Sequence, residues 1–407
     1  MIAAGMRPPA LAWSDDGMER PLLNRRMAGM GTTIFAEMSA LAVATESVNL
    51  GQGFPDTDGP AQIRQAAADA VMDGRGNQYP PGPGVPELRQ AIAAHQRRFY
   101  GLEVDPGTEV LVTAGATEAV AAALLALVEP GDEVIAFEPY YDSYAACIAL
   151  AGGIRVPVTL RAPGFRPDLD ALRAAVTPRT RLILLNSPHN PTGSVFTRAE
   201  LTAIAELACE RDLLVISDEV YEHMVYSGQH VPVGSLPGMA GRTVSVSSGG
   251  KTFSLTGWKV GWVTATADLV AAVRAVKQFL TFVSSGPFQY AIAEGLALPG
   301  AYYAGISASL RERRDLLCEG LERAGFVVYP PEGTYFVTTD ISQLGSDDGV
   351  EFCRNLPHQA GVVAIPNAVF YDDPDAGRFQ VRFAFCKRPE VLRDALARIE
   401  KWAAMRG

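Results

Sequence analysis

The sequence predicts an α/β protein in which a mostly parallel central sheet carries helices on both faces and is joined to a smaller α+β domain. Between residues 109 and 279, short strands rich in Val, Ile and Leu alternate with helical segments. These strands are continuous apolar runs, as expected of strands that are covered on both faces in a parallel sheet. After about Leu298, a long charged helix is followed by short strands and helices, which predicts the second domain.

The expected elements follow from apolar periodicity and from Gly and Pro signals. Residues 60–72 are predicted to be helical because Ile63, Ala67 and Ala70 share one face, and the helix at 86–99 begins with a proline in its first turn. Between them, residues 79–84 break the pattern. In the large domain we expect strands at 109–113, 133–137, 181–185, 213–217, 243–247 and 260–264, and helices at 116–128, 141–150, 198–210 and 267–279. In the smaller domain we expect helices at 302–324, 349–360 and 390–405, and strands at 326–329, 335–339 and 379–385.

These elements suggest three parts of the chain. Residues 1–55 are expected to supply an N-terminal arm, loose up to about residue 30, and part of the small domain. Residues 56–297 are expected to form the large, cofactor-binding domain, and residues 298–407 the C-terminal small domain. A chain of 407 residues is long enough for two such cores.

Composition limits the partners. The net charge of −10 argues against nucleic acid and anionic membranes as partners. The five cysteines are scattered and odd in number, which favours reduced thiols, and the five histidines show no metal-ligand spacing, so we expect no metal site. No apolar run reaches the length of a membrane span, and the first thirty residues resemble neither a signal peptide nor a transit peptide. We therefore expect a cytoplasmic protein.

Lys251 is the residue most informative about chemistry. It follows the strand expected at 243–247 and lies among small residues, with a second lysine, Lys259, eight positions on. A lysine held away from water loses proton affinity and becomes a neutral nucleophile that condenses with aldehydes. Together with the segments 190–193 and 218–221, this lysine favours Schiff-base chemistry with an aldehyde cofactor.

Several candidate residues follow strands, where open α/β sheets bind their ligands. Gly115, Ala116 and Thr117 lie between a strand and a helix, so their backbone N–H groups would point at an anion such as a phosphate. Ser248 and Lys259 would add a hydroxyl and a positive charge. Taken alone, residues 115–117 are more typical of an ordinary turn between a strand and a helix. Ser248 is also typical of a turn serine, and Lys259 of a solvated lysine.

Three further residues could hold the ring of such a cofactor. Asp218 ends a strand and could keep a ring nitrogen protonated, although an N-cap aspartate is common. Tyr221 and Asn190 could both hydrogen-bond a phenolate oxygen. Taken alone, Tyr221 is also typical of a packing residue, and Asn190 of a turn before proline.

Tyr141 and Arg382 complete the candidate set. Tyr141 follows a strand and could stack on the cofactor ring, or could simply be a core residue. Arg382 lies in an apolar strand and needs a partner. The planar guanidinium of Arg382 could donate two parallel hydrogen bonds to a substrate carboxylate. An ion pair with a carboxylate of the protein would also compensate its charge.

The order of these motifs along the chain carries more information than any one of them. The informative phrases are Asn-Leu-Gly-Gln-Gly-Phe-Pro-Asp at 49–56, Asn-Gln-Tyr-Pro at 77–80, Ser-Pro-His-Asn-Pro-Thr-Gly at 187–193, Asp-Glu-Val-Tyr-Glu-His at 218–223, Lys-Thr-Phe at 251–253 and Gly-Trp-Lys-Val-Gly-Trp at 257–262. From about Leu50 onward, the chain resembles the class I/II aminotransferases of the aspartate aminotransferase fold, which are fold type I enzymes that use pyridoxal 5′-phosphate. The branch that it resembles holds kynurenine, glutamine and methionine aminotransferases, together with actinobacterial N-succinyldiaminopimelate aminotransferases.

The resemblance implies a role for each matching residue. Lys251 matches the Schiff-base lysine and Asp218 the partner of the pyridine nitrogen, with Tyr221 and Asn190 on the phenolate oxygen. The phosphate site is matched by Gly115, Ala116, Thr117, Ser248 and Lys259, the stacking aromatic by Tyr141, and the substrate carboxylate site by Gly53, Asn190 and Arg382. Tyr79 matches a tyrosine that reaches the phosphate of the neighbouring subunit, so the family implies a homodimer with shared active sites.

The family resemblance also implies an activity, with alternatives. The expected reaction moves an amino group between an L-amino acid and a 2-oxo acid by a ping-pong mechanism. Residues 283–286 hold no arginine where aspartate enzymes bind a distal carboxylate, which argues against aspartate as donor. A long acidic donor of the N-succinyldiaminopimelate type and an aromatic, sulfur or glutamine-type donor are both compatible. The same scaffold could instead act as a cysteine-conjugate β-lyase or a carbanion oxidase or hydroxylase, or could bind the cofactor without catalysis.

Overall fold

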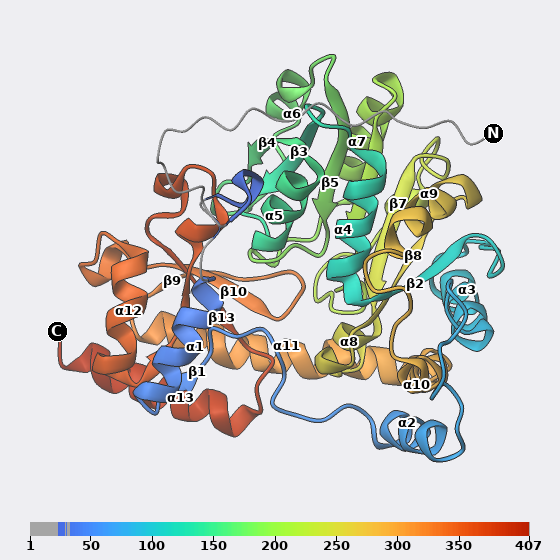
Figure 1. The fold of residues 1–407 in the computed structure, drawn as a ribbon. Helices are drawn as coiled ribbons and strands as arrows, with labels where there is room; N and C mark the ends of the chain where they lie inside the picture. The colour runs from blue at the N-terminus through green and yellow to red at the C-terminus, as the bar shows by residue number, and fades with distance from the viewer. Residues whose placement is uncertain (1–22, 29, 31–32, 407) are drawn as a thin grey trace, which may run out of the picture.

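The structure is a computed structural model that describes residues 23–28, 30 and 33–406. The loose arm expected at the N-terminus therefore falls mostly on residues 1–22, which lie outside the described residues. Figure 1 shows two packed regions, with the larger sheet in one and the C-terminal helices α12 and α13 in the other. The long helix α11 (Gly300–Arg323) runs between them.

The larger sheet has seven strands in the order β2-β8-β7-β6-β5-β3-β4. Neighbouring strands along the row β4-β3-β5-β6-β7 are all parallel, and β8 runs antiparallel to its two neighbours, β7 and β2. The prediction of a mostly parallel sheet is confirmed. The strand bounds are β2 Val110–Ala114, β3 Glu133–Glu138, β4 Ile154–Thr159, β5 Thr180–Asn186, β6 Leu214–Asp218, β7 Thr243–Ser248 and β8 Val260–Thr264.

Helices cover both faces of this sheet, as the continuous apolar strands predict. In β5, Leu182 and Leu184 pack with α4, α5 and α9, whereas Ile183 and Leu185 pack with α6 and α7 on the opposite face. Alternate residues of a strand point to opposite faces, so a strand buried on both sides is apolar throughout. The helix bounds are α2 Ala61–Met72, α3 Pro86–Tyr100, α4 Gly115–Leu127, α5 Asp142–Ala151, α6 Leu169–Ala175, α7 Arg198–Glu210, α8 Gly249–Thr252, α9 Ala267–Lys277 and α10 Gly286–Leu296.

The smaller region combines the C-terminal segment with residues from the N-terminal part of the chain. Its four-stranded sheet has the order β12-β13-β10-β9, and β1 pairs with β11 in a separate two-stranded sheet. Helix α1 packs against α12, so residues 34–49 belong with the C-terminal elements (Figure 1). The bounds are α1 Ile34–Ala44, β1 Val48–Asn49, β9 Val327–Tyr329, β10 Phe336–Asp340, α12 Gly349–Ala360, β11 Val362–Val363, β12 Ile365–Pro366, β13 Gln380–Ala384 and α13 Pro389–Ala404.

Some elements were not expected from the sequence. Strand β4 contains Pro157, and a proline cannot donate to a strand ladder, but β4 is an edge strand that pairs only with β3. The short helix α6 and helices α1 and α10 also lie outside the predicted set. Within the described part of the chain, no helix has both the length and the apolar character that crossing a membrane would require.

Candidate active site

A cavity of about 390 Å³ opens at the carboxyl ends of β5, β6 and β7, where it also meets the N-terminus of α4 and two strands of the smaller sheet, β10 and β13. Its size suits a cofactor together with a small substrate. The structure brings almost all of the candidate residues to its wall: Gly53, Gly115, Ala116, Thr117, Tyr141, Asn190, Asp218, Tyr221, Ser248, Lys251, Lys259 and Arg382. Tyr79 is the exception. Its side chain is 82% exposed and packs edge-on against the ring of Phe282.

Lys251 lies in α8, the short helix that directly follows β7. Its Nζ donates a hydrogen bond to the Tyr335 hydroxyl at 3.2 Å, and that hydroxyl donates to the Gly53 carbonyl at 2.7 Å. Burial lowers the pKa of Lys251 below its ordinary range. Cys386 and Asp218 oppose this shift, and the cations Lys259 and Arg382 have the smallest effects, which lower the pKa further. The amine is therefore closer to its neutral, nucleophilic form than a solvated lysine.

Asp218, the last residue of β6, is buried beside the cavity. The Tyr144 hydroxyl donates to its Oδ2 at 2.6 Å, and the Val220 N–H donates to its Oδ1 at 3.2 Å. Burial raises the pKa of Asp218, and these two hydrogen bonds and the charge of Lys251 oppose the rise. The carboxylate is thus held in place by neutral donors, and a protonated ring nitrogen would compensate its charge.

Arg382 lies in β13 and is only 1% exposed. Its Nη1 donates to Asn190 Oδ1 at 2.9 Å and its Nη2 to the Gly51 carbonyl at 3.0 Å, while its Nε has no partner among the described residues. Burial lowers its pKa to about 10, so it remains charged at neutral pH. No described carboxylate pairs with this guanidinium, so the alternative of an internal ion pair does not account for it.

The N-terminus of α4 and Lys259 form an anion site. Gly115 has φ +77°, and a Cβ at this position would lie 3.1 Å from the Lys259 Nζ. A Cβ at Gly261 would lie 2.7 Å from the Ala116 nitrogen, so glycine is needed there for β8 to approach this turn. Helix N-termini present free N–H groups and a partial positive charge. Together with the Lys259 ammonium, they fit a phosphate group.

The aromatic residues fit the ring of a cofactor. Tyr141 and Tyr221 both line the cavity, and the Tyr221 ring lies edge-on to Tyr335 with centroids 5.2 Å apart. Burial raises the pKa of Tyr221, so its hydroxyl stays protonated and can donate. An amine, a carboxylate, an anion cradle and aromatic walls in one cavity fit a phosphorylated aldehyde cofactor.

Sequence reasoning did not identify several residues of this site. Tyr144 lies three positions after Tyr141, and this spacing could have placed both on one helix face toward Asp218. Asn186 ends β5, where it accepts from the Asn190 N–H at 2.7 Å and donates to the Asp218 carbonyl at 2.8 Å. Tyr335 comes from the other region of the molecule, and no local pattern predicts its contact with Lys251.

Comparison with known proteins defines the class. The chain belongs to the aminotransferase class I and II family, whose model matches residues 45–399. A curated relative from Mycobacterium tuberculosis, described as a probable N-succinyldiaminopimelate aminotransferase, is 53% identical over 386 residues, which cover 92% of this chain and 97% of that protein. A methionine aminotransferase from Escherichia coli is 44% identical over 377 residues, covering 92% of this chain and 97% of that protein.

Solved structures agree with this assignment. The structure of N-succinyldiaminopimelate aminotransferase from Mycobacterium tuberculosis has a TM-score of 0.91 and 53% identity, and the match covers 93% of this chain and all of that chain. An Escherichia coli protein with a methionine aminotransferase function has a TM-score of 0.90 and 43% identity, covering 94% of this chain and all of that chain. The protein is an aminotransferase, and the lyase, oxidase and non-catalytic alternatives are not favoured.

Proposed function

We propose that this aminotransferase carries pyridoxal 5′-phosphate on the Lys251 amine and accepts a long amino acid, of the N-succinyldiaminopimelate type, as its amino donor. When bound, this cofactor supplies the aldehyde that takes up the amino group and the ring that withdraws electrons from the substrate. One observation carries the proposal: Lys251, with its lowered pKa, shares a cavity with the carboxylate of Asp218 and with the guanidinium of Arg382, which no described carboxylate pairs.

The reacting groups have separate tasks in this proposal. Lys251 would hold the cofactor, and its amine, once freed by an incoming amino acid, would move a proton from the substrate α-carbon to the aldehyde carbon of the cofactor. Asp218, held by Tyr144, keeps a proton on the ring nitrogen. Tyr221 donates to the phenolate oxygen, as does the Asn190 Nδ2, because the Asn190 Oδ1 already accepts from Arg382.

The remaining residues bind and orient. The N–H groups of Ala116 and Thr117, the hydroxyl of Ser248 and the Lys259 ammonium hold the phosphate. The guanidinium N–H groups of Arg382 bind the substrate α-carboxylate, together with the backbone of Gly53. Tyr141 covers one face of the ring. Each role is supported by the position of the residue on the wall of the cavity.

The substrate class follows from the charges that line the cavity. Among the described lining residues, the cations are Lys251, Lys259 and Arg382, and each already has a role. A short dicarboxylic donor would bring a second carboxylate without a cationic partner, at the cost of desolvating a charge. A long donor would extend along Phe35 and Phe54, which also line the cavity, and Phe54 is 48% exposed to solvent. The similarity to the N-succinyldiaminopimelate enzyme supports this choice.

A panel of donors tests the substrate proposal. Purified protein is supplied with 2-oxoglutarate or pyruvate and with N-succinyldiaminopimelate, methionine, glutamine, kynurenine or aspartate, and kcat/KM is measured for each pair. We expect N-succinyldiaminopimelate to give the highest kcat/KM and aspartate the lowest. A methionine or kynurenine preference would overturn the donor assignment but would leave the assignment of transamination intact, and a methionine preference would match the relative described as a methionine aminotransferase.

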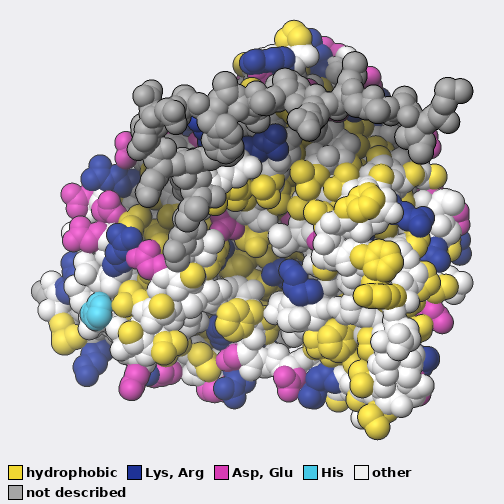
Figure 2. All heavy atoms as spheres, in the orientation of Figure 1, with side chains coloured by type: hydrophobic (Ala, Val, Ile, Leu, Met, Phe, Trp, Pro, Cys, Tyr) yellow, Lys and Arg dark blue, Asp and Glu magenta, His cyan; other side chains and the backbone are white. Residues whose placement is uncertain are grey.

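The proposal includes a homodimer in the cytoplasm. Large apolar side chains lie exposed at Met72, Tyr79, Phe279 and Phe282, and Figure 2 shows hydrophobic side chains gathered on the right half of the face drawn. Such a patch is typical of a protein interface, and Tyr79 would reach the partner's phosphate from it. We also propose the domain limits 1–55, 56–297 and 298–407, supported by a hydrophobic core that is built mostly from α1 and the C-terminal elements. The molar mass in solution tests the dimer, and a monomer at working concentration contradicts it.

A further inference from the structure

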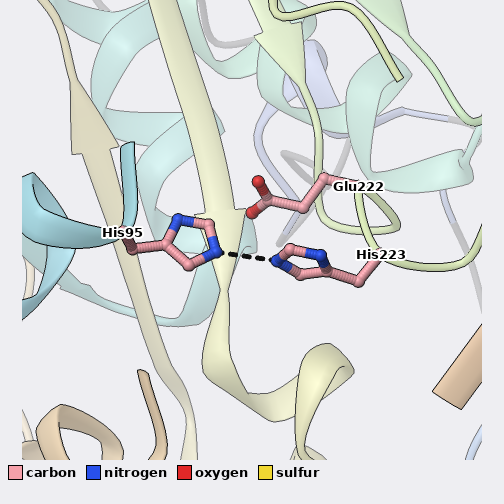
Figure 3. Close-up of side chains that lie close together, drawn as sticks. All are labelled: His95, Glu222 and His223. Atoms are coloured by element: carbon pink, nitrogen blue, oxygen red, sulfur yellow. Dashed lines mark hydrogen bonds between the residues drawn. The ribbon is translucent and has the colours of Figure 1, made fainter. Parts of the chain in front are cut away.

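A second cluster of functional side chains lies behind the cavity, on the opposite side of the segment that follows β6. His95 comes from α3, and Glu222 and His223 follow Tyr221 directly in sequence (Figure 3). None of the three lines the cofactor cavity. The histidine spacing in the sequence does not reveal this cluster, because His95 and His223 are 128 positions apart.

The two imidazoles face each other. The Nε2 atoms of His95 and His223 lie 2.7 Å apart and share a hydrogen bond, with the Glu222 carboxylate beside them (Figure 3). One ligand atom from each of the three residues lies within 4.8 Å of the other two. Two imidazole nitrogens and a carboxylate oxygen form a ligand set that zinc prefers.

Charge balance provides an independent argument. Glu222 is 5% exposed, and its carboxylate accepts from the hydroxyls of Tyr100 (at 2.5 Å) and Ser247 but pairs with no described cation. A buried carboxylate without a countercharge is costly. The His95 and His223 rings use their Nε2 atoms for the hydrogen bond that joins them, and neither ring donates to the Glu222 carboxylate. Neutral imidazoles are the form that binds metals.

The surroundings favour a divalent cation. The nearby charged groups are Glu219, which faces His230 at 3.5 Å, and Arg98, whose guanidinium lies over the rings of Phe99 and Tyr303. Together with Glu222, these groups give a net negative charge around the cluster. His95 is buried and His223 is partly exposed, so an ion would enter from the His223 side, where a water molecule could be its fourth ligand.

We propose that His95, Glu222 and His223 bind a zinc-class divalent ion, which replaces the proton shared by the two histidines. Tetrahedral binding would move the two Nε2 atoms apart to about 3.3 Å, a small change for side chains that meet from separate elements. Glu222 directly follows Tyr221, and it accepts a hydrogen bond from Ser247, which directly precedes Ser248. A bound ion would therefore stabilise the backbone that carries Tyr221 and Ser248 in the cofactor site. Its role is structural, since none of the three residues lines the cofactor cavity.

The test uses the complete protein saturated with cofactor, freed of metal by a chelator and titrated with zinc chloride. We expect one zinc per chain by calorimetry and by metal analysis, and an increase of Tm with zinc. His95→Gln and His223→Gln each remove a ligand and are expected to weaken binding by about tenfold or more. His358→Gln, which changes an exposed histidine of α12, is the matched control and should bind as the unmodified protein does.

The outcomes separate the proposal from a simple hydrogen-bonded pair of histidines. An anomalous difference peak at the zinc edge between His95 and His223 would support the site directly. Equal zinc binding by His95→Gln, His223→Gln and His358→Gln would overturn it, as would an unmodified protein that binds no zinc. Neither readout depends on transamination, so failure of the proposed donor specificity leaves this test intact.

Discussion

The segment that follows β6 has two sides with opposite charge requirements. Toward the cavity, Asp218 and Tyr221 share the wall with Arg382, a buried guanidinium that no described carboxylate pairs, and with the exposed ammonium of Lys259. Toward α3, Glu222 is a buried carboxylate without a cation. A protein rarely leaves buried charge uncompensated. The comparison supports both proposals, in which the cavity side would bind a phosphate and a carboxylate and the α3 side would bind a cation.

The largest expected effect is on the cavity side, at Lys251. Lys251→Ala removes both the attachment point of the cofactor and the amine that moves the proton, so kcat should fall by about 10⁴-fold or more. The overall transamination rate and the visible absorbance of the purified protein are the measurements. Lys401→Ala, an exposed lysine of α13, is the control and should retain full activity. A Lys251→Ala protein with even one tenth of the normal kcat would falsify the assignment.

A paired substitution tests the comparison itself. Asp218→Asn and Glu222→Gln both replace a carboxylate with an amide of similar size, four positions apart. Asp218→Asn should lower kcat by about 10³-fold, because it removes the charge that holds a proton on the ring nitrogen. Glu222→Gln should lower kcat much less and should act mainly on the free energy of unfolding and on zinc affinity. Equal losses of kcat would show that the two sides do not have separate functions.

The sequence predicted most of the fold because parallel α/β sheets leave a strong local pattern. Strand β5 and helix α7 lie close to their expected limits, since their apolar spacing records burial directly. Strand β4 lies outside the prediction because Pro157 is tolerated only at an edge, and edge position is a property of the whole sheet. Helix α1 packs on α12, a contact across more than 300 residues that no local pattern encodes.

The residues of the candidate site also differ in whether a local sequence pattern could predict them. Lys251 and Asp218 could be found because each follows a strand, and strand ends meet at one edge of a parallel sheet. Tyr335 and His95 could not, because the partners that they contact, Lys251 and His223, come from distant segments.

Arg382 offers a smaller, sharper test of the cavity side. Arg382→Lys keeps the positive charge but removes the planar fork, so the hydrogen bonds to Asn190 and Gly51 cannot both persist. We expect kcat/KM for every amino donor to fall by about 10- to 100-fold, the value of one or two charged hydrogen bonds. Arg354→Lys, an exposed arginine paired with Glu37, is the control. Unchanged kinetics in Arg382→Lys would mean that charge alone, without the fork, holds the carboxylate.

The smallest expected effect is the pH dependence of stability that Lys251 causes in the protein freed of cofactor. Burial lowers the pKa of Lys251 from its ordinary 10.5, so the unfolded chain binds a proton more readily than the folded one between the two pKa values. The penalty is complete below the folded pKa and disappears as pH rises toward 10.5. Lys251→Met removes the titrating group, so the variant should be more stable than the original at pH 7, by a margin that narrows as pH increases. Urea unfolding at several pH values measures this margin, and a constant or widening margin would mean that the Lys251 amine is not held with a lowered pKa.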